Sequence, residues 1–464
     1  MTDPQLAALP ETEECIRTVR EWLAQRPEQP LAYLHSFGCQ LNVADGEKLT
    51  GLLEAMGYGM TGDPAEASLI LYNTCAVREN AEDRVFGTLG SIKHLKTANP
   101  GLILCVTGCM TAQESVAEKL RRSYPYVDIV LGSSAVQRLP QMLYAKMHGQ
   151  RHAYDTETYT DIPEGVPTRR ESSFKAAVPI MYGCNNFCTY CIVPYVRGRE
   201  RSRTQAAILA EVRELVGAGY KEIMLLGQNV NSFTPADGTD FPGLLREIDK
   251  IPGDFWIRFM SSHPKDATPA LMDAILECKH VAKHLHLPVQ SGSNDVLQRM
   301  NRRYTVEKYL SQVDYIRSKC PDFSLTTDLI VGFPDESEAD FEATLELVSR
   351  VRFDNMYSFI YSKRTGTKAA LMDDPVTDAE KSARMQRLLA LQREIAVENN
   401  KRFVGRTLRV LVDGESKKRP GCITGRSSEN MLVEFTGDAA LIGSFVDVEI
   451  TESHSGALSG VLTN

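Results

Sequence analysis

The sequence predicts an α/β protein with three structured parts: an open parallel-sheet domain, a partial barrel of six strand–helix units, and a small antiparallel β-barrel. Three observations lead to this prediction. Short apolar runs alternate with stretches of helical spacing through most of the chain, which is typical of parallel sheets with crossover helices. Residues 404–464 instead carry valine-rich runs separated by Gly, Ser and Asp, which is typical of small antiparallel barrels. The length of 464 residues is also too great for one ordinary domain.

Composition sets the broad class of protein. Hydrophobic residues make up 43% of the chain and charged residues 24%, as in globular proteins. No apolar run approaches the ~18 residues of a transmembrane helix, and the N-terminus lacks the pattern of a secretory signal. We therefore expect a cytoplasmic monomer with no membrane anchor, whose cysteines bind metal or catalyse rather than form disulfides. The net charge of −8 excludes a uniformly basic chain but allows a local basic groove for nucleic acid.

Residues 31–149 are predicted to form the open parallel-sheet domain. Three apolar runs are short and bounded by polar residues or glycine, and a helical pattern follows each of them, which is the βαβ pattern. Residues 1–30 are predicted to be an N-terminal extension with one helix over 11–26. The polar residues 150–172 are interpreted as a linker. The three apolar runs are 31–37, 68–72 and 102–106.

Residues 170–400 are predicted to form a partial (βα)6 barrel. Six candidate strands alternate with helical patterns, and the site of such a barrel lies at the carboxyl ends of its strands. A long helical pattern over 377–403 leads to the predicted small β-barrel at 403–464. The candidate strands are 177–182, 221–227, 255–261, 284–289, 324–331 and 355–361.

Three cysteines form a compact set directly after the first candidate barrel strand. Cys184, Cys188 and Cys191 have the spacing Cys-x3-Cys-x2-Cys. Three thiolates are one ligand short of a full set for a cubane iron–sulfur cluster or a structural zinc, so one metal position stays open for another molecule. A zinc loop is the alternative, although zinc loops more often use paired Cys-x2-Cys units.

Three other cysteines are spread along the parallel-sheet domain. Cys39, Cys75 and Cys109 each follow one of its predicted strands, at intervals of 36 (75 − 39) and 34 (109 − 75) residues. Because ligands of open α/β sheets bind beyond the carboxyl ends of the strands, these three cysteines can meet at one rim. The alternative is three ordinary buried thiols, since cysteine is often buried.

The compact motif, with the aromatic Tyr190 before its last cysteine, resembles the motif of the radical S-adenosylmethionine (SAM) superfamily. The resemblance implies that the open iron chelates the amino and carboxylate groups of SAM. It further implies that reduction cleaves SAM to methionine and a 5′-deoxyadenosyl radical. The residues that the resemblance assigns to SAM binding are Tyr190, Gly227, Gln228, Asn229 and Gln290.

The order of the three parts resembles the methylthiotransferase family of radical SAM enzymes over residues 31–464, with a TRAM RNA-binding domain at the end. The resemblance is strongest to the tRNA-modifying MiaB type, which converts N6-(dimethylallyl)adenosine beside the anticodon to its 2-methylthio form. It implies a second 4Fe-4S cluster, on Cys39, Cys75 and Cys109, that holds a sulfur atom methylated by one SAM. A radical from a second SAM then removes hydrogen from the adenine C2 carbon. The matching stretches are 73–79, 183–203, 226–231 and 285–293.

The expected partners are a tRNA, a reductant such as flavodoxin, and a sulfur source. Arg197, Arg199 and Arg203 follow the compact motif and are expected to contact tRNA phosphates or the SAM carboxylate, the alternative being a solvated charged loop. Two other activities within the family stay open: a RimO-type enzyme acting on a ribosomal protein aspartate, and a methylthiotransferase for threonylcarbamoyl-adenosine in tRNA. A non-catalytic, zinc-containing RNA-binding module is the alternative outside the family.

Overall fold

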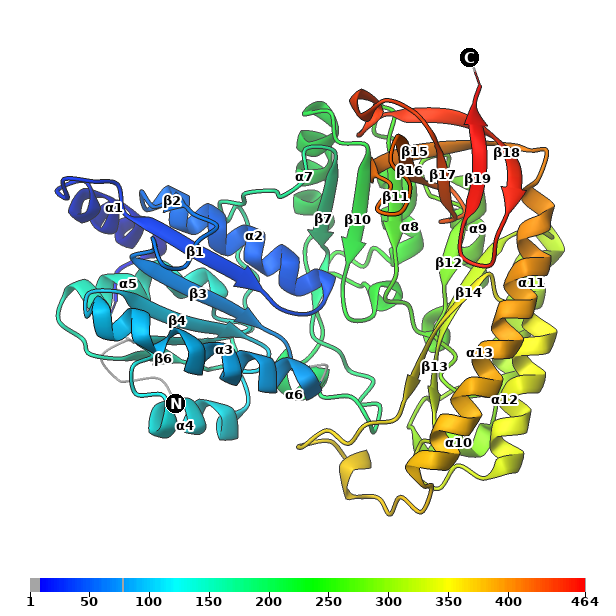
Figure 1. The fold of residues 1–464 in the computed structure, drawn as a ribbon, viewed down its shortest axis with the longest axis horizontal. Coiled ribbons are helices and arrows are strands. Elements are labelled where there is room, and N and C mark those ends of the chain that lie inside the picture. The colour runs from blue at the N-terminus through cyan, green and yellow to red at the C-terminus, as the bar shows by residue number, and fades with distance from the viewer. Residues whose placement is uncertain (1–8, 77–78, 464) are drawn as a thin grey trace. The chain divides into compact units, whose positions relative to one another are not determined.

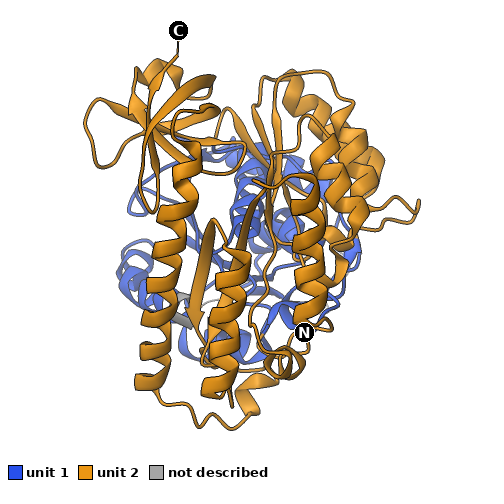
Figure 2. Cartoon of the chain, turned by 90° about the vertical axis from the view of Figure 1, so that its right-hand side faces the viewer, with its two compact units in different colours: residues 1–171, 182–187, 191–201 blue, residues 172–181, 188–190, 202–464 orange. Residues whose placement is uncertain are grey.

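The computed structural model describes residues 9–76 and 79–463. It divides into two compact units, shown in different colours in Figure 2. Unit 1 comprises the chain up to residue 171 together with 182–187 and 191–201, and unit 2 comprises 172–181, 188–190 and 202–464. The compact cysteine motif lies where the chain alternates between the units. The boundaries predicted for the four segments 1–30, 31–149, 170–400 and 403–464 remain predictions.

Unit 1 is built on a six-stranded parallel sheet in the order β2-β1-β3-β4-β5-β6 (Figure 1). Helices α1, α2 and α5 pack on one face of this sheet, and α3 and α4 on the other. Adjacent residues of β3 point to opposite faces, as the period of a strand requires: Leu71 joins the first apolar cluster and Tyr72 the second. The elements are α1 (Thr12–Leu23), β1 (Leu31–Ser36), α2 (Gln40–Ala55), β2 (Gly59–Met60), β3 (Leu69–Thr74), α3 (Glu79–Ala98), β4 (Ile103–Gly108), α4 (Glu114–Ser123), β5 (Ile129–Gly132), α5 (Leu139–Met147) and β6 (Ala153–Asp155).

Two segments of unit 1 clarify the sequence-based expectations. The N-terminal helix α1 packs on the sheet domain, because its Val19 and Leu23 are buried in the cluster shared with α2 and α5. The interpretation of residues 150–172 as a linker is wrong at β6, which pairs in parallel with β5 and extends the sheet. A strand of three residues is too short to show the alternation of apolar and polar residues that marks longer strands.

Unit 2 contains six parallel strands arranged as two sheets, β7-β10-β11 and β12-β13-β14. A parallel bridge between Ile257 and Val281 links the two sheets, and one apolar cluster takes side chains from all six strands. The predicted partial (βα)6 barrel is therefore confirmed. Its elements are β7 (Lys175–Pro179), α7 (Gln205–Gly217), β10 (Glu222–Leu226), α8 (Phe241–Asp249), β11 (Trp256–Phe259), α9 (Pro269–Glu277), β12 (His284–His286), α10 (Asn294–Arg299), α11 (Val306–Lys319), β13 (Ser324–Val331), α12 (Glu338–Val351) and β14 (Asn355–Ile360). The short elements β8 (Met181–Tyr182), α6 (Val193–Val196) and β9 (Arg201–Ser202) lie where the chain alternates between the units.

The C-terminal segment of unit 2 is a closed barrel in the order β15-β16-β17-β19-β18. It is antiparallel, as predicted, except that β17 and β19 pair in parallel. The long helix α13 leads into it. These elements are α13 (Asp378–Asn400), β15 (Thr407–Glu415), β16 (Cys422–Ser427), β17 (Leu432–Thr436), β18 (Phe445–Ser453) and β19 (Leu458–Leu462).

The C-terminal barrel packs against the amino ends of the partial-barrel strands (Figure 1). The rings of Trp256, which begins β11, and Phe445 lie 4.7 Å apart. The hydroxyl of Ser324, which begins β13, donates to the Glu429 carbonyl at 2.9 Å. The carboxyl ends of these strands, where the site is expected, therefore lie at the opposite end of unit 2. Among residues 9–76 and 79–463, no helix is long and apolar enough to cross a membrane.

Candidate active site

The three spread cysteines of unit 1 follow three adjacent parallel strands. Cys39 comes after β1 and caps the N-terminus of α2, Cys75 directly follows β3, and Cys109 directly follows β4. Because β1, β3 and β4 are neighbours in the sheet and run in one direction, their carboxyl ends form one edge. We call this edge, with Cys39, Cys75 and Cys109, the sulfur rim.

Short-range contacts show how closely the sulfur rim is packed. The Sγ atoms of Cys39 and Cys109 lie 3.9 and 3.8 Å from one acceptor, the side-chain oxygen of Asn42. Gly38 has a φ of +110°, and a Cβ atom at that position would lie 2.7 Å from the Sγ of Cys75. Only glycine therefore fits beside Cys75 without moving its sulfur.

The amide of Asn42 and the guanidinium of Arg197 hold the sulfur rim in place. Asn42 Nδ2 donates to the carbonyls of Phe37 and Thr74 at 2.9 and 2.7 Å, which ties the end of β1 to the end of β3. Arg197 donates from Nε to the Cys109 Sγ at 2.9 Å and from Nη2 to Asn42 Oδ1 at 2.8 Å. Sequence reasoning missed Asn42, although an asparagine one turn into a helix after a cysteine was a usable signal.

The environment of the rim favours a thiolate at Cys39. A hydrogen bond from the Cys75 side chain is the main cause that lowers the pKa of Cys39 to about 6; burial opposes this effect and the charge of Arg197 adds to it. Burial raises the pKa of Cys109, although Arg197 opposes that shift. Cys39 is exposed, whereas Cys75 and Cys109 are buried. The rim thus combines one exposed cysteine, whose thiol pKa is lowered although protein atoms surround much of the thiol, with two buried cysteines.

The sulfur rim offers three thiols at one sheet edge as candidate ligands of an iron–sulfur cluster. Within the described part of the chain, no three His, Cys, Asp or Glu side chains are placed to hold one ion. In a cubane cluster each thiolate binds a different iron, so three sulfurs need to share a rim rather than converge on a point. Three thiols at one sheet edge, with a glycine making room beside them, match that requirement.

The compact motif occupies the loop between β8 and α6. Gly183 has a φ of +77°, and a Cβ there would lie 2.1 Å from the Arg199 carbonyl oxygen, so this turn needs glycine. Within unit 1, the Cys184 amide donates to the Gly198 carbonyl at 3.2 Å. The loop is therefore held by its own backbone, with Cys184 and Cys191 in unit 1 and Cys188 in unit 2.

A buried arginine also accompanies Cys188 in unit 2. Arg302 Nη1 lies 3.5 Å from the Cys188 Sγ and 3.5 Å from the hydroxyl of Tyr190. Burial alone would lower the pKa of Arg302, but Tyr190, Tyr304 and Cys188 outweigh it and raise that pKa above its usual value. Tyr190 thus lies beside Cys188 and a fixed positive charge. Arg302 lies after the end of α10 and is buried, with 5% of the residue exposed.

Polar atoms at the carboxyl ends of β10 and β11 lack hydrogen-bond partners among the described residues. They are the side-chain oxygens of Gln228 and Asn229, the hydroxyl of Ser262 and the Nε2 of His263. Buried polar groups in proteins are almost always paired, so four such atoms at one end of a barrel fit a bound polar ligand. Ser262 and His263 were missed in the sequence, although polar residues directly after a candidate strand were a usable signal.

The hydrogen bonds of Asn229 and His263 define what they offer to a ligand. Asn229 Nδ2 donates to Asp266 at 2.8 Å, which leaves its oxygen as an acceptor. The Lys265 amide donates to His263 Nδ1 at 3.1 Å, so the neutral ring carries its proton on Nε2 and offers a donor. Burial is the main cause that lowers the pKa of His263, with Arg302 and Lys265 adding to it. Gly227 is buried beside them, and a Cβ there would meet the Met181 side chain at 2.5 Å.

Gln290 lies in a strained turn beside β13. Its φ is +71°, its amide donates to the Asp328 carbonyl at 2.9 Å, and its carbonyl accepts from the Ile330 amide at 3.0 Å. The backbone of Gln290 is therefore fixed to β13, whose carboxyl end lies at the mouth of unit 2. Gln290 as a whole is 7% exposed.

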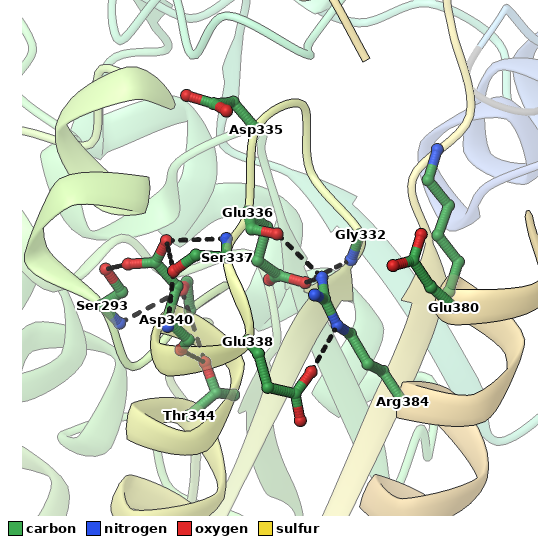
Figure 3. Close-up of polar contacts among 12 residues, drawn as sticks. Ser293, Gly332, Asp335, Glu336, Ser337, Glu338, Asp340, Thr344, Glu380 and Arg384 are labelled. Carbon is green, nitrogen blue, oxygen red and sulfur yellow. Dashed lines mark hydrogen bonds and ion pairs between the residues drawn. The ribbon is translucent and has the colours of Figure 1, made fainter. Parts of the chain in front are cut away.

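The loop after β13 is fixed from two sides, as Figure 3 shows. The Gly332 amide donates to the Glu336 carboxylate at 2.8 Å, and Arg384 of α13 pairs with Glu336 at 3.1 Å. On the other side, the Ser293 hydroxyl donates to Asp340, which also forms the capping box of α12 with Ser337. The mouth of unit 2 is thus preorganised around residues 290–293 and 332–340.

The three arginines expected to contact tRNA lie in different environments. Arg197 is buried and pairs with Asp45 at 2.7 Å, and Arg203 is buried and pairs with Glu211 at 2.7 Å. Arg199 is exposed, with its guanidinium 4.5 Å from the ring centre of Phe187. As the side chains lie, only Arg199 of the three presents its charge to solvent.

Three family models match the chain, each to a different part. Residues 178–348 match the Radical SAM superfamily, residues 31–132 match the family described as Uncharacterized protein family UPF0004, and residues 401–463 match the TRAM domain. The expected radical SAM and TRAM parts are therefore confirmed. The UPF0004 match covers strands β1 to β5 of the sheet that carries the sulfur rim.

Curated relatives match nearly the whole chain. A tRNA-2-methylthio-N(6)-dimethylallyladenosine synthase of Acetivibrio thermocellus is 49% identical over 436 residues, covering 93% of this chain and 91% of its own. The chain belongs to this family. The synthase of Thermoanaerobacter pseudethanolicus is also 49% identical, over 433 residues, covering 93% of this chain and 92% of its own. The expected membership of the methylthiotransferases is confirmed, and the chain is a radical SAM enzyme whose family implies SAM and a 4Fe-4S cluster.

Solved structures support the fold. The radical SAM methyltransferase TsrM from Kitasatospora setae, with tryptophan and a SAM analogue bound, has a TM-score of 0.55 at 14% identity and covers 74% of this chain and 75% of its own. A second structure of TsrM, with cobalamin and a [4Fe-4S] cluster bound, has a TM-score of 0.53 at 13% identity and covers 86% and 81%. At this identity the likeness concerns the fold alone.

Proposed function

We propose that this chain attaches a methylthio group to the C2 carbon of N6-(dimethylallyl)adenosine in tRNA. The observation that carries the proposal is the 49% identity over 93% of the chain to synthases named for this product. The sulfur rim supports it, because a sulfur-inserting enzyme needs a second sulfur-bearing site besides the radical SAM motif.

The proposal assigns a 4Fe-4S cluster to each cysteine set. Cys184, Cys188 and Cys191 hold the cluster that binds SAM, and Cys39, Cys75 and Cys109 hold a second cluster. When bound, the first cluster with SAM would supply a radical that takes hydrogen from the substrate carbon, and the second cluster would carry the sulfur atom that is transferred. Asn229 and His263 bind SAM through the acceptor and donor that the described residues leave without partners.

Other residues of the chain position and hold the substrate. Arg302 keeps a positive charge beside Cys188 and Tyr190, and the fixed loops at 290–293 and 332–340 shape the mouth of unit 2. Arg199 and the exposed turn at 417–419 contact tRNA phosphates. The reaction also requires a reductant of the flavodoxin class and a sulfur source. Because its substrate is tRNA, we place the enzyme in the cytoplasm.

The decisive experiment is nucleoside analysis of tRNA by liquid chromatography and mass spectrometry. Cells that lack this chain are expected to lose 2-methylthio-N6-(dimethylallyl)adenosine and to accumulate the unmethylthiolated precursor. Complementation with the intact gene restores the product. An unchanged nucleoside profile would contradict the proposal, and loss of a methylthio threonylcarbamoyl-adenosine instead would reassign the substrate.

A further inference from the structure

Among the arginines that the structure describes near the cysteines, Arg197 is distinguished by the three side chains of the sulfur rim that share its one guanidinium. Its Nε donates to the Cys109 Sγ at 2.9 Å, and its Nη2 donates to Asn42 Oδ1 at 2.8 Å and pairs with Asp45 at 2.7 Å. Asn42 in turn lies within 3.9 Å of the Cys39 Sγ. Arg197 therefore contacts Cys109 directly and is linked to Cys39 through Asn42.

The burial of Arg197 excludes an ordinary surface role. Its side chain is 4% exposed, so as it lies it presents almost no area to a phosphate in solution. Burial alone would lower the pKa of Arg197, but Asp45 and the sulfurs of Cys109 and Cys39 outweigh it and raise that pKa above its usual value. Burying a cation costs hydration free energy, and such partners offset this cost.

The backbone beside Arg197 is also anchored to the sulfur rim. Ile192 and Val196 pack with Ala76 and Cys109 in one small apolar cluster, and the Ser133 hydroxyl donates to the Val196 carbonyl. Arg197 stands six residues after Cys191 of the compact motif (197 − 191), in the same stretch of unit 1. The segment that supplies one thiolate of the compact motif therefore also supplies the cation of the sulfur rim.

We infer that Arg197 is a positioning residue for the cluster at Cys39, Cys75 and Cys109: it fixes the Cys109 sulfur and, through Asn42, the neighbourhood of Cys39. This inference rests on the proposed cluster at the rim. Arginine suits the role because its planar guanidinium donates from three nitrogens in fixed directions, whereas lysine donates from one nitrogen whose hydrogens rotate freely. Its charge also offsets the negative charge that thiolates bring to the cluster, and net charge and hydrogen bonds to sulfur set the reduction potential of such clusters.

The test isolates the rim cluster in the full-length chain by replacing Cys184, Cys188 and Cys191 with Ala. Iron and sulfide per chain are measured after anaerobic reconstitution with ferrous iron and sulfide, and the reduction potential is followed by electron paramagnetic resonance. In this background, Arg197→Met is expected to lower iron per chain at least threefold, and Arg197→Lys to retain more iron than Met but at a shifted potential.

Two matched variants separate positioning from general damage to the fold. Arg258 is equally buried and pairs with Glu222 at 2.7 Å in unit 2, so Arg258→Met removes a comparable buried cation away from the rim. Arg197→Met combined with Asp45→Asn avoids leaving a buried carboxylate unpaired. We expect Arg258→Met to keep the iron content, and the double variant to remain folded by circular dichroism while it loses iron.

Full iron content and an unchanged potential in the folded double variant would overturn the role of Arg197. A background chain that binds no iron even with Arg197 intact would instead overturn the rim cluster itself, and the inference with it. Loss of iron in Arg258→Met to the same extent would also count against Arg197, because burial of any arginine would then matter equally.

Discussion

The sulfur rim of unit 1 and the strand ends of unit 2 each contain an asparagine and a basic side chain, but the hydrogen bonds of these side chains differ. At the rim, Asn42 and Arg197 are engaged with the cysteines and with each other. At the ends of β10 and β11, the side chains of Asn229 and His263 each retain a buried atom without a partner among the described residues. Arg197 Nη1 at the rim also lacks a partner among the described residues, so the contrast lies in the sulfur atoms. At the rim Asn42 and Arg197 engage the Cys109 sulfur, whereas the mouth of unit 2 keeps polar side-chain atoms for a ligand.

This difference indicates how permanent each bound group is. A cluster that stays through many turnovers benefits from ligands whose positions are fixed before it binds, because little ordering is then required. SAM is consumed and replaced, so its site must release its products, and polar atoms satisfied only by the ligand allow exchange. We therefore expect substitutions at the rim to act through cofactor content, and substitutions in unit 2 to act through SAM affinity.

The largest expected effect comes from the rim cysteines. Replacing Cys39, Cys75 and Cys109 with Ala removes all thiolate ligands of one of two clusters, so iron per chain should fall by about half, from about eight to about four. Methylthiolated product should become undetectable while SAM cleavage continues. The measurements are iron and sulfide content, 5′-deoxyadenosine formation and tRNA nucleoside analysis of the same preparation.

Cys188→Ala is the matched variant for this comparison, since it removes a ligand from the compact motif. It should abolish SAM cleavage as well as product. Methylthiolation by the rim variant at the rate of the unaltered chain would break the distinction between the two cysteine sets.

Much of this contrast was visible in the sequence. The six cysteines, the glycines before them and the alternation of strands and helices are local patterns, and this alternation predicts parallel sheets. Arg197 was noticed, but its environment was misjudged, because burial depends on Asp45 and Asn42 about 150 residues earlier in the chain. The spacing of apolar residues within a short stretch of sequence gives no information on contacts between residues so far apart in the chain.

The remaining gaps have the same physical cause. The strand β6 is too short for its pattern to be recognised, and β16 and β19 were not singled out because their glycines and serines weaken the apolar signal. The unpartnered atoms of Ser262 and His263 become visible only when every hydrogen bond around them has been assigned. Motifs identify chemistry from residue types, whereas the state of each polar atom follows from the folded chain.

A second prediction concerns SAM affinity and Asn229. Asn229→Ala removes an acceptor oxygen that the described residues leave unpaired, and a hydrogen bond to a charged group contributes about 1.5–3 kcal/mol. The dissociation constant of SAM should therefore rise by about 10- to 100-fold, with no change in iron content. Isothermal titration calorimetry of the anaerobic, reconstituted enzyme measures both the affinity and the fraction of active sites.

Asn399 provides the control for this substitution. Its amide donates to the Arg352 carbonyl at 3.0 Å from helix α13, away from the ends of β10 and β11. Asn399→Ala should lower the melting temperature but leave SAM affinity unchanged. Equal SAM affinity in Asn229→Ala and the unaltered chain would show that its free oxygen does not face the ligand.

A third, smaller effect is a loss of stability of unit 2 in acid. Burial is the main cause that lowers the pKa of both His263 and His284, so each stays neutral in the folded chain and becomes charged on unfolding below pH ~6.5. The unfolded state then binds more protons, and the free energy of unfolding falls by about 1.4 kcal/mol per pH unit for each histidine. The stabilisation is thus complete above pH ~6.5 and is lost progressively as the pH falls.

The two tryptophans make this effect measurable for unit 2 alone. Trp22 lies in unit 1 and Trp256 in unit 2, so Trp22→Phe leaves fluorescence that reports on unit 2. Urea unfolding of this variant at pH 7, 6 and 5 should show the decline, and His284→Asn should reduce its slope. A free energy of unfolding that stays constant over this range would contradict the neutral state of both histidines.

The smallest expected effect lies in the C-terminal barrel, which packs against the amino ends of the strands, away from the mouth. Lys417 and Lys418 are exposed in the turn between β15 and β16. If each contacts one phosphate, the double change to Ala should weaken tRNA binding several-fold and lower the slope of log affinity against log salt by about 1–2. Turnover at saturating tRNA should be unchanged, because neither side chain reaches the reacting atoms.

Lys250→Ala, which removes an exposed lysine paired with Glu247, serves as the control. An unaltered salt slope in the double variant would mean that tRNA reaches the mouth of unit 2 without using this turn.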